Sequence, residues 1–263
     1  MLLKNKNAVI YGAGGAIGST VAKAFAKEGA KVFLTGRNLA SVSATGKDIV
    51  AAGGAAEAAQ VDALDERAVE EHIVAVVKNA GTIDVSFNAI GIPQPGIQGI
   101  PLAELAVESF MAPITTYMRS HFLTARAAAR RMVEKRSGVI LMHTPEPARL
   151  GLPLVGGMGP AWAAMEGFNR NLSAEFAAHG IRVVCLRSSG LPETHAFDGV
   201  LGLHAKAMGI PREQFRAFIE SMTHRKRSST LAEVADVAVF LASDKASGMT
   251  GTVANLTGGM IVD

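Results

Sequence analysis

Four glycines lie within seven residues of the sequence, at Gly12, Gly14, Gly15 and Gly18. They follow a short apolar run and precede an Ala-rich segment. Glycines at a strand-to-helix turn let backbone N–H groups approach a pyrophosphate at the N-terminus of the helix. The spacing is not Gly-x-Gly-x-x-Gly, because Ile17 occupies the third glycine position. On the glycines alone, a plain tight turn is the competing interpretation.

The residues after the next predicted strand indicate which nucleotide the chain would bind. NAD-binding proteins usually carry an acidic residue about 20 positions beyond the glycines, where it hydrogen-bonds the ribose. Here the sequence reads Thr35-Gly36-Arg37-Asn38, without an acid. A guanidinium can bind the 2′-phosphate of NADP through two hydrogen bonds. Arg37 therefore predicts NADP(H) rather than NAD(H), and a solvated turn arginine is the alternative.

His143 and Glu146 are candidates for acid–base chemistry, because they end or follow the strand predicted at 138–143. In open α/β sheets, binding sites lie beyond the carboxyl ends of the strands. Histidine exchanges protons near neutral pH. Pro145 and Pro147 flank Glu146, so a surface glutamate in a loop is the competing interpretation. The 7 histidines are scattered without metal-ligand spacing, so no metal site is predicted.

The elements that must position these residues alternate along the chain. Strands are predicted at 7–11, 31–35, 58–61, 83–88, 138–143, 181–186 and 252–256. Helices are predicted at 17–28, 39–52, 66–79, 161–179 and 231–242, with a helix-rich stretch at 102–136 that breaks near Pro113. This alternation predicts an α/β fold with one doubly wound, mainly parallel, Rossmann-type sheet covered by helices on both faces.

The length of 263 residues fits a single α/β domain spanning 1–263. One segment, 190–229, departs from the alternation of strands and helices. Insertions of this length in compact domains are often lids or binding loops, so we expect it to cover a substrate. An ordinary helical subdomain is the alternative.

Composition excludes several classes of function. With 26 basic and 23 acidic side chains, the charge is too even for a protein that binds nucleic acid or a membrane surface. The 1 cysteine excludes a disulfide framework and fits a reducing compartment. The uncharged stretches carry Pro and Gly and would not form a membrane helix. We expect a cytoplasmic protein whose partner is a small-molecule substrate or ligand.

Several motifs resemble those of the classical short-chain dehydrogenase/reductase family, in the correct order from about residue 5 to the end. The turn at 11–18 is similar to the family's Thr-Gly-x-x-x-Gly-x-Gly, with Tyr11 for Thr and Ala16 for one Gly. Asp62 stands at the family's adenine-contacting Asp, and 88–91 stands at its Asn-Asn-Ala-Gly. The terminal signature is similar at 239–244 and 250–259.

The resemblance implies an NADP(H) cofactor, and NAD(H) is the less favoured alternative. The residues expected to contact it are Gly12, Gly14, Gly15, Ile17, Gly18, Arg37, Asn38, Asp62, Ala63, Asn88, Ala89 and Gly91. The resemblance also implies a homodimer or homotetramer. A basic run at 126–136 admits an acyl-carrier protein as partner, with a solvated helix face as the alternative interpretation.

The resemblance fails at the catalytic pair. The family uses Tyr-x-x-x-Lys on the helix after the fifth strand. When the chain is aligned on 166–168 and 172–176, the Tyr position falls on Met158 and the Lys position on Trp162. The family's Ser position falls on Pro145, beside Thr144 and Glu146, and its Asn position falls near 116–117. The only tyrosines are Tyr11 and Tyr117, so no shift of alignment restores the pair.

Three interpretations remain open. In the first, His143 or Glu146 serves as the proton donor of an oxidoreductase that acts on an apolar carbonyl or enone. The pocket for this substrate would include Thr144, Met158 and Trp162. In the second, the chain binds NADP(H) without turnover, as a sensor or partner subunit. In the third, the cofactor site has also decayed and the fold serves as a scaffold.

Overall fold

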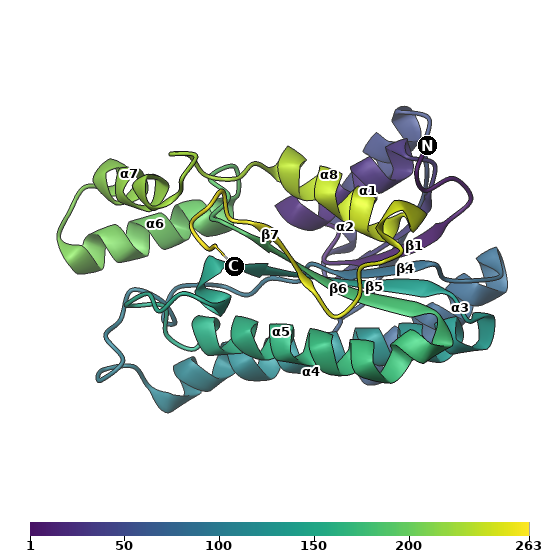
Figure 1. The fold of residues 1–263 in the computed structure, drawn as a ribbon, viewed down its shortest axis with the longest axis horizontal. Coiled ribbons are helices and arrows are strands. Elements are labelled where there is room, and N and C mark those ends of the chain that lie inside the picture. The colour runs from purple at the N-terminus through teal and green to yellow at the C-terminus, as the bar shows by residue number, and fades with distance from the viewer. Residues whose placement is uncertain (263) are drawn as a thin grey trace.

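The computed structural model describes residues 1–262 and contains one parallel sheet between two layers of helices (Figure 1). The strand order is β3-β2-β1-β4-β5-β6-β7. The strands are β1 (Asn7–Tyr11), β2 (Lys31–Gly36), β3 (Ala55–Gln60), β4 (Val85–Asn88), β5 (Gly138–Pro145), β6 (Ile181–Ser188) and β7 (Val253–Leu256). The order reverses between β1 and β4. This topology confirms the predicted doubly wound α/β fold and creates a crevice at the reversal point.

Helices cover both faces of the sheet. They are α1 (Ala16–Lys27), α2 (Leu39–Ala51), α3 (Glu66–Ala80), α4 (Val107–Lys135), α5 (Met158–Phe176), α6 (His195–Met208), α7 (Arg212–Met222) and α8 (Leu231–Ala242). Helices α1, α2 and α8 pack on one face of the sheet and α3, α4 and α5 on the other. Each of the two helix layers covers one large apolar cluster. Helices α6 and α7 extend beyond the sheet, as Figure 1 shows.

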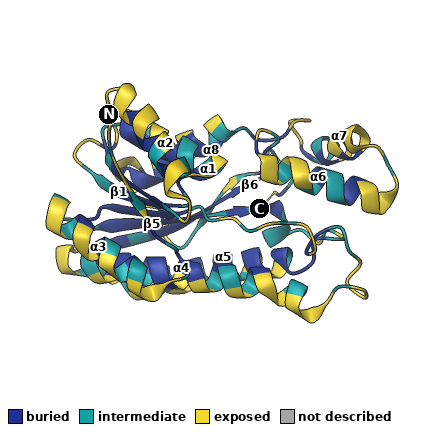
Figure 2. Ribbon diagram, turned by 180° about the vertical axis from the view of Figure 1, so that it is seen from behind, coloured by how far each residue is buried: buried dark blue, intermediate teal, exposed yellow. Residues whose placement is uncertain are grey.

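The central strands are buried on both faces, which explains their near-continuous apolar sequences. In β1, Ala8 and Ile10 belong to the apolar cluster under α1, whereas Val9 and Tyr11 belong to the cluster on the opposite face. Figure 2 shows these strands as buried and the outer surfaces of the helices as exposed. The edge strand β3 is mostly exposed and Ala-rich, and the predicted strand at 58–61 overlaps only its last three residues.

The predicted break near Pro113 is wrong, because α4 runs through this residue without interruption. Pro113 lies in the second turn, where its missing N–H removes one helical hydrogen bond. The residue is buried, and an added Cβ on Gly157 would lie 3.0 Å from its ring. Close packing against the start of α5 therefore holds the helix together at this point. Helix α5 begins at Met158, three residues earlier than predicted.

The segment 190–229 contains α6 and α7, which pack against each other through a small apolar cluster of their own. Its buried members are Leu201, Ala205, Phe215 and Ile219. Among residues 1–262, no helix combines the length and apolarity that crossing a membrane requires.

Candidate functional site

The glycine-rich turn joins β1 to α1 at the point where the strand order reverses. Gly12 has a φ of +74°, and a Cβ added to it would lie 2.7 Å from the carbonyl oxygen of Ala89. A Cβ added to Gly18 would collide with the carbonyl of Gly12. Gly15 is the N-cap of α1 and provides no side-chain cap. The first N–H groups of α1 are therefore available to an anion.

A cavity of about 390 Å³ adjoins this turn. Nine of the residues predicted to contact a cofactor line it: Gly12, Gly14, Gly15, Arg37, Asn38, Asp62, Ala63, Ala89 and Gly91. Thr35, Gly36, Ser41, Val61 and Ile90 also line it and were not predicted. These residues lie within three positions of predicted residues in the sequence. Extending each predicted strand end by a few residues would have found them. The Oδ1 atom of Asp62 accepts a hydrogen bond from Leu64 N at 3.0 Å, which shapes the turn after β3.

Arg37 is exposed at the rim of this cavity, and its guanidinium forms no ion pair with residues 1–262. Gln60 Nε2 donates to the backbone carbonyl of Arg37 at 3.0 Å, which ties the turn after β2 to the end of β3. Asn38 caps α2 by accepting a hydrogen bond from Ser41 N at 3.2 Å. A cationic side chain, a hydroxyl group and a helix N-terminus thus lie together at one end of the cavity, and this combination suits a phosphate.

A second cavity, of about 430 Å³, adjoins the first and has five lining residues in common with it. The shared wall consists of Gly15, Ala89, Ile90, Gly91 and Ile92. Ile17 and Asn88, both predicted to contact a cofactor, line the second cavity only. Apart from histidine, the described residues that line it include no acidic or basic side chain. This cavity therefore suits an uncharged ligand, because a buried charge would find no counterion there.

Asn88 is buried at the end of β4 and shapes the loop between the two cavities. Its Nδ2 donates to Thr124 Oγ1 at 3.1 Å, and its Oδ1 accepts from Ile90 N at 3.1 Å. The side chain therefore holds the following loop against α4. This geometry fixes the shared wall from which both cavities are built.

His143 lines the second cavity from β5. Its Nε2 lies 2.9 Å from the hydroxyl of Ser188, at the end of β6. Burial lowers the pKa of His143 to about 4, so the ring is neutral at pH 7. Ser188 also lines the cavity and was not predicted. Ser188 ends β6, the strand next to β5, and this position at a carboxyl strand end could have identified it as a cavity residue.

Glu146 lies in the short 3₁₀ helix after β5 and is 4% exposed, so the surface-loop interpretation is wrong. Its Oε2 has no hydrogen-bond partner among the described residues, and burial raises its pKa to about 7. The flanking prolines suggested an exposed loop, but Pro145 ends β5 and Pro147 lies in the 3₁₀ helix. Glu146 lines neither cavity.

Thr144 and Met158 also lie outside both cavities. Side chains alternate along β5, so Thr144 points to the opposite face from His143. There its hydroxyl donates to Glu166 Oε1 at 3.0 Å. Glu166 is bound by Arg187 Nε at 2.7 Å and Nη2 at 2.6 Å, which forms a buried ion pair between α5 and β6. Met158 is fully buried in the core.

Trp162 lines the second cavity, together with Tyr117 and His121 from α4. The Tyr117 and Trp162 rings lie 6.4 Å apart, and His121 Nδ1 lies 2.9 Å from Tyr117 O. Burial raises the pKa of Tyr117 to about 12 and lowers that of His121 to about 4. Both groups are therefore neutral at pH 7. His121 was not predicted, although it lies four residues after Tyr117 and hence on the same helix face.

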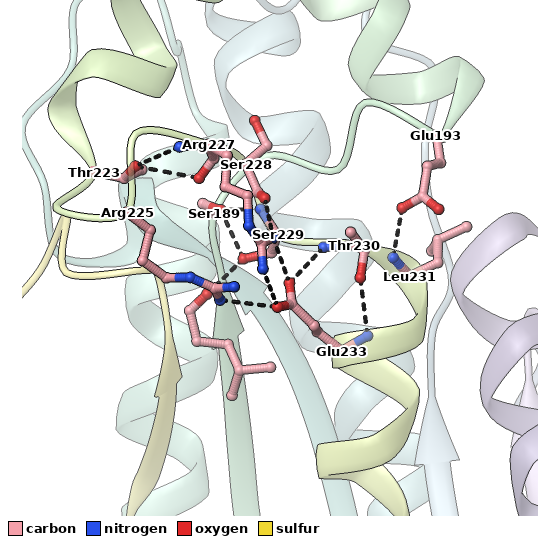
Figure 3. A network of polar contacts seen from close by, with 11 residues as sticks. Ser189, Glu193, Thr223, Arg225, Arg227, Ser228, Ser229, Thr230, Leu231 and Glu233 are labelled. Atoms are coloured by element: carbon pink, nitrogen blue, oxygen red, sulfur yellow. Dashed lines mark hydrogen bonds and ion pairs between the residues drawn. The ribbon is translucent and has the colours of Figure 1, made fainter.

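The segment 190–229 closes one side of the second cavity through Thr194, His195, Ala196, Phe197 and Val200. A polar network, shown in Figure 3, holds its C-terminal end to the sheet. Ser229 Oγ donates to Leu256 O at 2.6 Å, and Ser229 N donates to Ser189 Oγ at 2.9 Å.

Helix α8 begins in the same network. Glu233 Oε1 accepts from Arg227 Nη2 at 2.6 Å and pairs with Arg225 at 2.8 Å. Thr230 and Glu233 form a capping box at the start of the helix. The end of the segment 190–229 is therefore anchored to both the sheet and α8.

The basic run on α4 faces the acidic residues of α3. Arg126 binds Glu66, and Arg130 Nη1 lies 2.7 Å from Glu70 Oε1. Lys135 Nζ lies 2.7 Å from Asp84 Oδ1. These ion pairs join neighbouring elements of this chain, so much of the run is already neutralised. An acyl-carrier protein as partner stays a prediction.

Comparison with known proteins agrees with this geometry. The family described as Enoyl-(Acyl carrier protein) reductase matches residues 12–261. The chain is 32% identical over 259 residues to the uncharacterized oxidoreductase YxbG of Bacillus subtilis (strain 168), covering 98% of this chain and 92% of that protein.

Two solved structures show the same fold. The chain aligns with an NAD⁺-bound xylitol dehydrogenase with a TM-score of 0.93 at 23% identity, over 98% of this chain and 100% of that one. It aligns with a gluconate 5-dehydrogenase of Burkholderia cenocepacia J2315, in complex with NADP and tartrate, with a TM-score of 0.85 at 24% identity, over 98% and 96%. With its matched length, its fold and its glycine-rich cavity, the chain belongs to the short-chain dehydrogenase/reductase family of oxidoreductases.

Proposed function

We propose that this protein is an NADP(H)-dependent oxidoreductase that acts on a neutral, apolar carbonyl or enone. The five lining residues that the two cavities share carry the proposal. A dinucleotide whose pyrophosphate lies on the glycine-rich turn would extend along the shared wall, Gly15 and Ala89–Ile92, into the second cavity. When bound there, the nicotinamide supplies the hydride, and the protein positions it against the substrate.

The residues of the first cavity fit this nucleotide. The N-terminus of α1 would hold the pyrophosphate, and Asp62 would face the adenine. Arg37 and Ser41, at the start of α2, would hold the 2′-phosphate, which favours NADP(H) over NAD(H). Among its structural relatives, the gluconate 5-dehydrogenase is in complex with NADP and the xylitol dehydrogenase is bound to NAD⁺.

His143 is the residue that we propose as proton donor, since the family's Tyr and Lys positions carry Met158 and Trp162. In reduction, the hydride adds to carbon and a protonated His143 would give its proton to the substrate oxygen, directly or through Ser188. With a pKa of about 4, little of His143 is protonated at pH 7. The rate should therefore rise about tenfold per pH unit as the pH falls from 7 to 5. Glu146 is not proposed, because it lines neither cavity.

A second candidate is an NADP(H)-binding protein without turnover, which acts as a sensor or partner subunit. The neutral state of His143 at pH 7 and the raised pKa of Tyr117 favour it, because a neutral imidazole has no readily released proton to give and a phenol with a pKa of about 12 is a weak acid. The two candidates make the same prediction for nucleotide binding and opposite predictions for catalysis.

Calorimetric titration with NADPH, followed by a panel of neutral ketones and enones monitored by NADPH absorbance, distinguishes them. Binding with turnover that rises toward acid pH, and that is lost in His143→Gln, supports the oxidoreductase. Binding without turnover on any substrate supports the sensor. Absence of NADPH binding contradicts both and leaves the scaffold.

The double variant Met158→Tyr with Trp162→Lys tests the rest of the site. Gain of carbonyl reduction would show that the cofactor and the substrate are already aligned in this protein. No gain, together with unchanged NADPH binding, would count against a substrate position beside Trp162, the one of the two residues that lines the second cavity.

A further inference from the structure

Three side chains form a chain of hydrogen bonds at the wall of the second cavity. Gln94 and Gln98 lie in the loop between β4 and α4, and His204 lies on α6. Gln94 Nε2 donates to Ile92 O at 2.8 Å, and Gln98 Nε2 donates to Gln94 Oε1 at 2.7 Å. His204 Nε2 lies 3.0 Å from Gln98 Oε1. The chain thus connects residues 106 positions apart in the sequence.

This chain has only one consistent direction. The carbonyl of Ile92 can only accept, so the amide nitrogen of Gln94 must face it and Gln94 Oε1 must face Gln98. The same reasoning turns Gln98 Oε1 toward His204. Nε2 of His204 must then carry a proton. Burial lowers the pKa of His204, so the ring is the neutral tautomer that donates from Nε2.

The surrounding packing holds the chain in place. Gln98 and His204 are 4% and 5% exposed, and the His204 ring stacks on Phe215 with centroids 5.3 Å apart. Gly99 N donates to Leu154 O at 2.8 Å. A Cβ added to Gly99 would lie 3.0 Å from Leu203 O, so the loop and α6 are in close contact. The two amide groups therefore have fixed orientations.

One donor on each glutamine remains unused. A glutamine amide has two N–H groups, and within residues 1–262 each of these side chains uses one. Both residues line the second cavity. An entirely apolar ligand would offer these N–H groups no acceptor, which is unfavourable for donors at a cavity wall. A carboxylate or phosphate would find no counterion, because the lining residues carry no Lys or Arg.

We propose that Gln94 and Gln98 determine the specificity of this cavity. They select neutral ligands that carry an uncharged acceptor oxygen, such as an ether, a hydroxyl or a second carbonyl, in addition to the reacting carbonyl. His204 is a positioning residue, because it orients Gln98 from α6. This inference rests on the proposed function only in taking the second cavity as the substrate site.

A matched pair of probes tests the inference. The bicyclic ketones 1-tetralone and 4-chromanone differ only in one ring position, where an ether oxygen replaces a methylene group. Binding is measured by calorimetry and by the fluorescence of Trp162, which lines the cavity and is the 1 tryptophan of the chain. We expect the wild-type protein to bind 4-chromanone about 3–10-fold more tightly, the effect of one net hydrogen bond.

Variants test whether this preference comes from the hydrogen-bonded residues Gln94, Gln98 and His204. In Gln94→Leu and Gln98→Leu, the ratio of the two affinities should fall to about 1, with the affinity for 1-tetralone unchanged or higher. Gln214→Leu, at an exposed position of α7, is the matched control and should keep the wild-type ratio. His204→Phe should lower the ratio, and His204→Gln, which keeps an N–H donor near the Nε2 position, should restore it.

An equal affinity for both probes in the wild-type protein would overturn the inference. So would a preference that survives in both leucine variants, or a wild-type protein that binds neither probe. If Gln98→Leu fails to fold, Gln94→Leu gives the same test at a half-buried position. Calorimetry with NADPH on the same preparations tests the proposed function separately. NADPH binding without a probe preference contradicts this inference alone, and a preference without NADPH binding contradicts the proposed function alone.

Discussion

Arg37 is the residue on which the choice between NADP(H) and NAD(H) depends. Its guanidinium is free of ion pairs with residues 1–262 and lies at the rim of the first cavity beside the start of α2. We expect Arg37→Ala to weaken NADPH binding about 10–100-fold, the effect of losing a charge-assisted hydrogen-bond pair. Calorimetry would measure both nucleotides, and NADH affinity should change little.

Lys47→Ala is the control for Arg37→Ala, because Lys47 is an exposed cation on α2, the helix that follows Arg37. It changes the net charge equally but lies outside both cavities. An equal loss of NADPH affinity in both variants would indicate a general electrostatic effect and contradict the role of Arg37.

Glu146 is a buried carboxyl group whose pKa of about 7 exceeds the ordinary value of 4.5. The folded state therefore holds a proton that the unfolded state has lost between about pH 4.5 and 7. Stability falls with rising pH across this range, by up to about 3 kcal/mol. Glu146→Gln removes this titration. The free energy of unfolding of the variant, relative to that of the wild-type protein, should therefore be higher at pH 8 than at pH 4.5. Urea unfolding of both proteins at the two pH values measures the difference, and a pH-independent difference would contradict the buried acid.

At the scale of the elements, α5 and β6 are joined by the buried ion pair of Glu166 and Arg187. Removing one partner of a buried pair typically costs about 3–5 kcal/mol, because the other charge keeps its desolvation cost. We expect Glu166→Gln to lower the free energy of unfolding by about this amount. The double change Glu166→Met with Arg187→Met should cost less than Glu166→Gln alone. Urea unfolding measures all three proteins.

Glu134→Gln is the comparison for this prediction. Glu134 pairs with Arg131 at 3.4 Å on the exposed side of α4, with 69% of its side chain accessible. Surface pairs contribute about 0–1 kcal/mol, so this change should have little effect. Similar losses from Glu134→Gln and Glu166→Gln would show that burial does not govern the α5–β6 contact.

At the scale of the whole molecule, His72, His121 and His143 are held neutral by burial, each with a pKa of about 4. The unfolded chain protonates these residues near pH 6.5, before the folded protein does. Stability should therefore fall as the pH drops from about 6.5 to about 4, with each residue contributing about 2 kcal/mol at pH 5. This outweighs the opposite effect of Glu146. Urea unfolding should give a lower free energy at pH 5 than at pH 7.

The variant His121→Phe isolates one of these contributions. Its stability should depend less on pH between 6.5 and 4 than that of the wild-type protein, because one buried imidazole is gone. His224→Gln, at an exposed position, should keep the wild-type dependence. If His121→Phe and the wild-type protein show the same dependence, His121 does not stay neutral in the folded state.

Much of the fold was predictable because its signals are local. Alternating apolar runs and helical segments predicted the doubly wound sheet. The glycine-rich turn and the strand ends gave nine residues of the first cavity, since the carboxyl ends of parallel strands meet at one edge. The errors arose where packing overrides local preference. Pro113 stays helical against α5, and Glu146, between two prolines, is buried at the start of a 3₁₀ helix.

The sequence by itself determined the family, the cofactor turn and the absence of any Tyr after residue 117. Only the tertiary structure decided which side chains share the second cavity. The neighbours of His143 and Gln98 are Ser188 and His204, which lie 45 and 106 residues away in the sequence. Contacts at such separations depend on how strands and helices pack, and no local pattern of residue types encodes them. Burial, which makes the histidines neutral and the cavity suited to uncharged ligands, is likewise a property of the packed molecule.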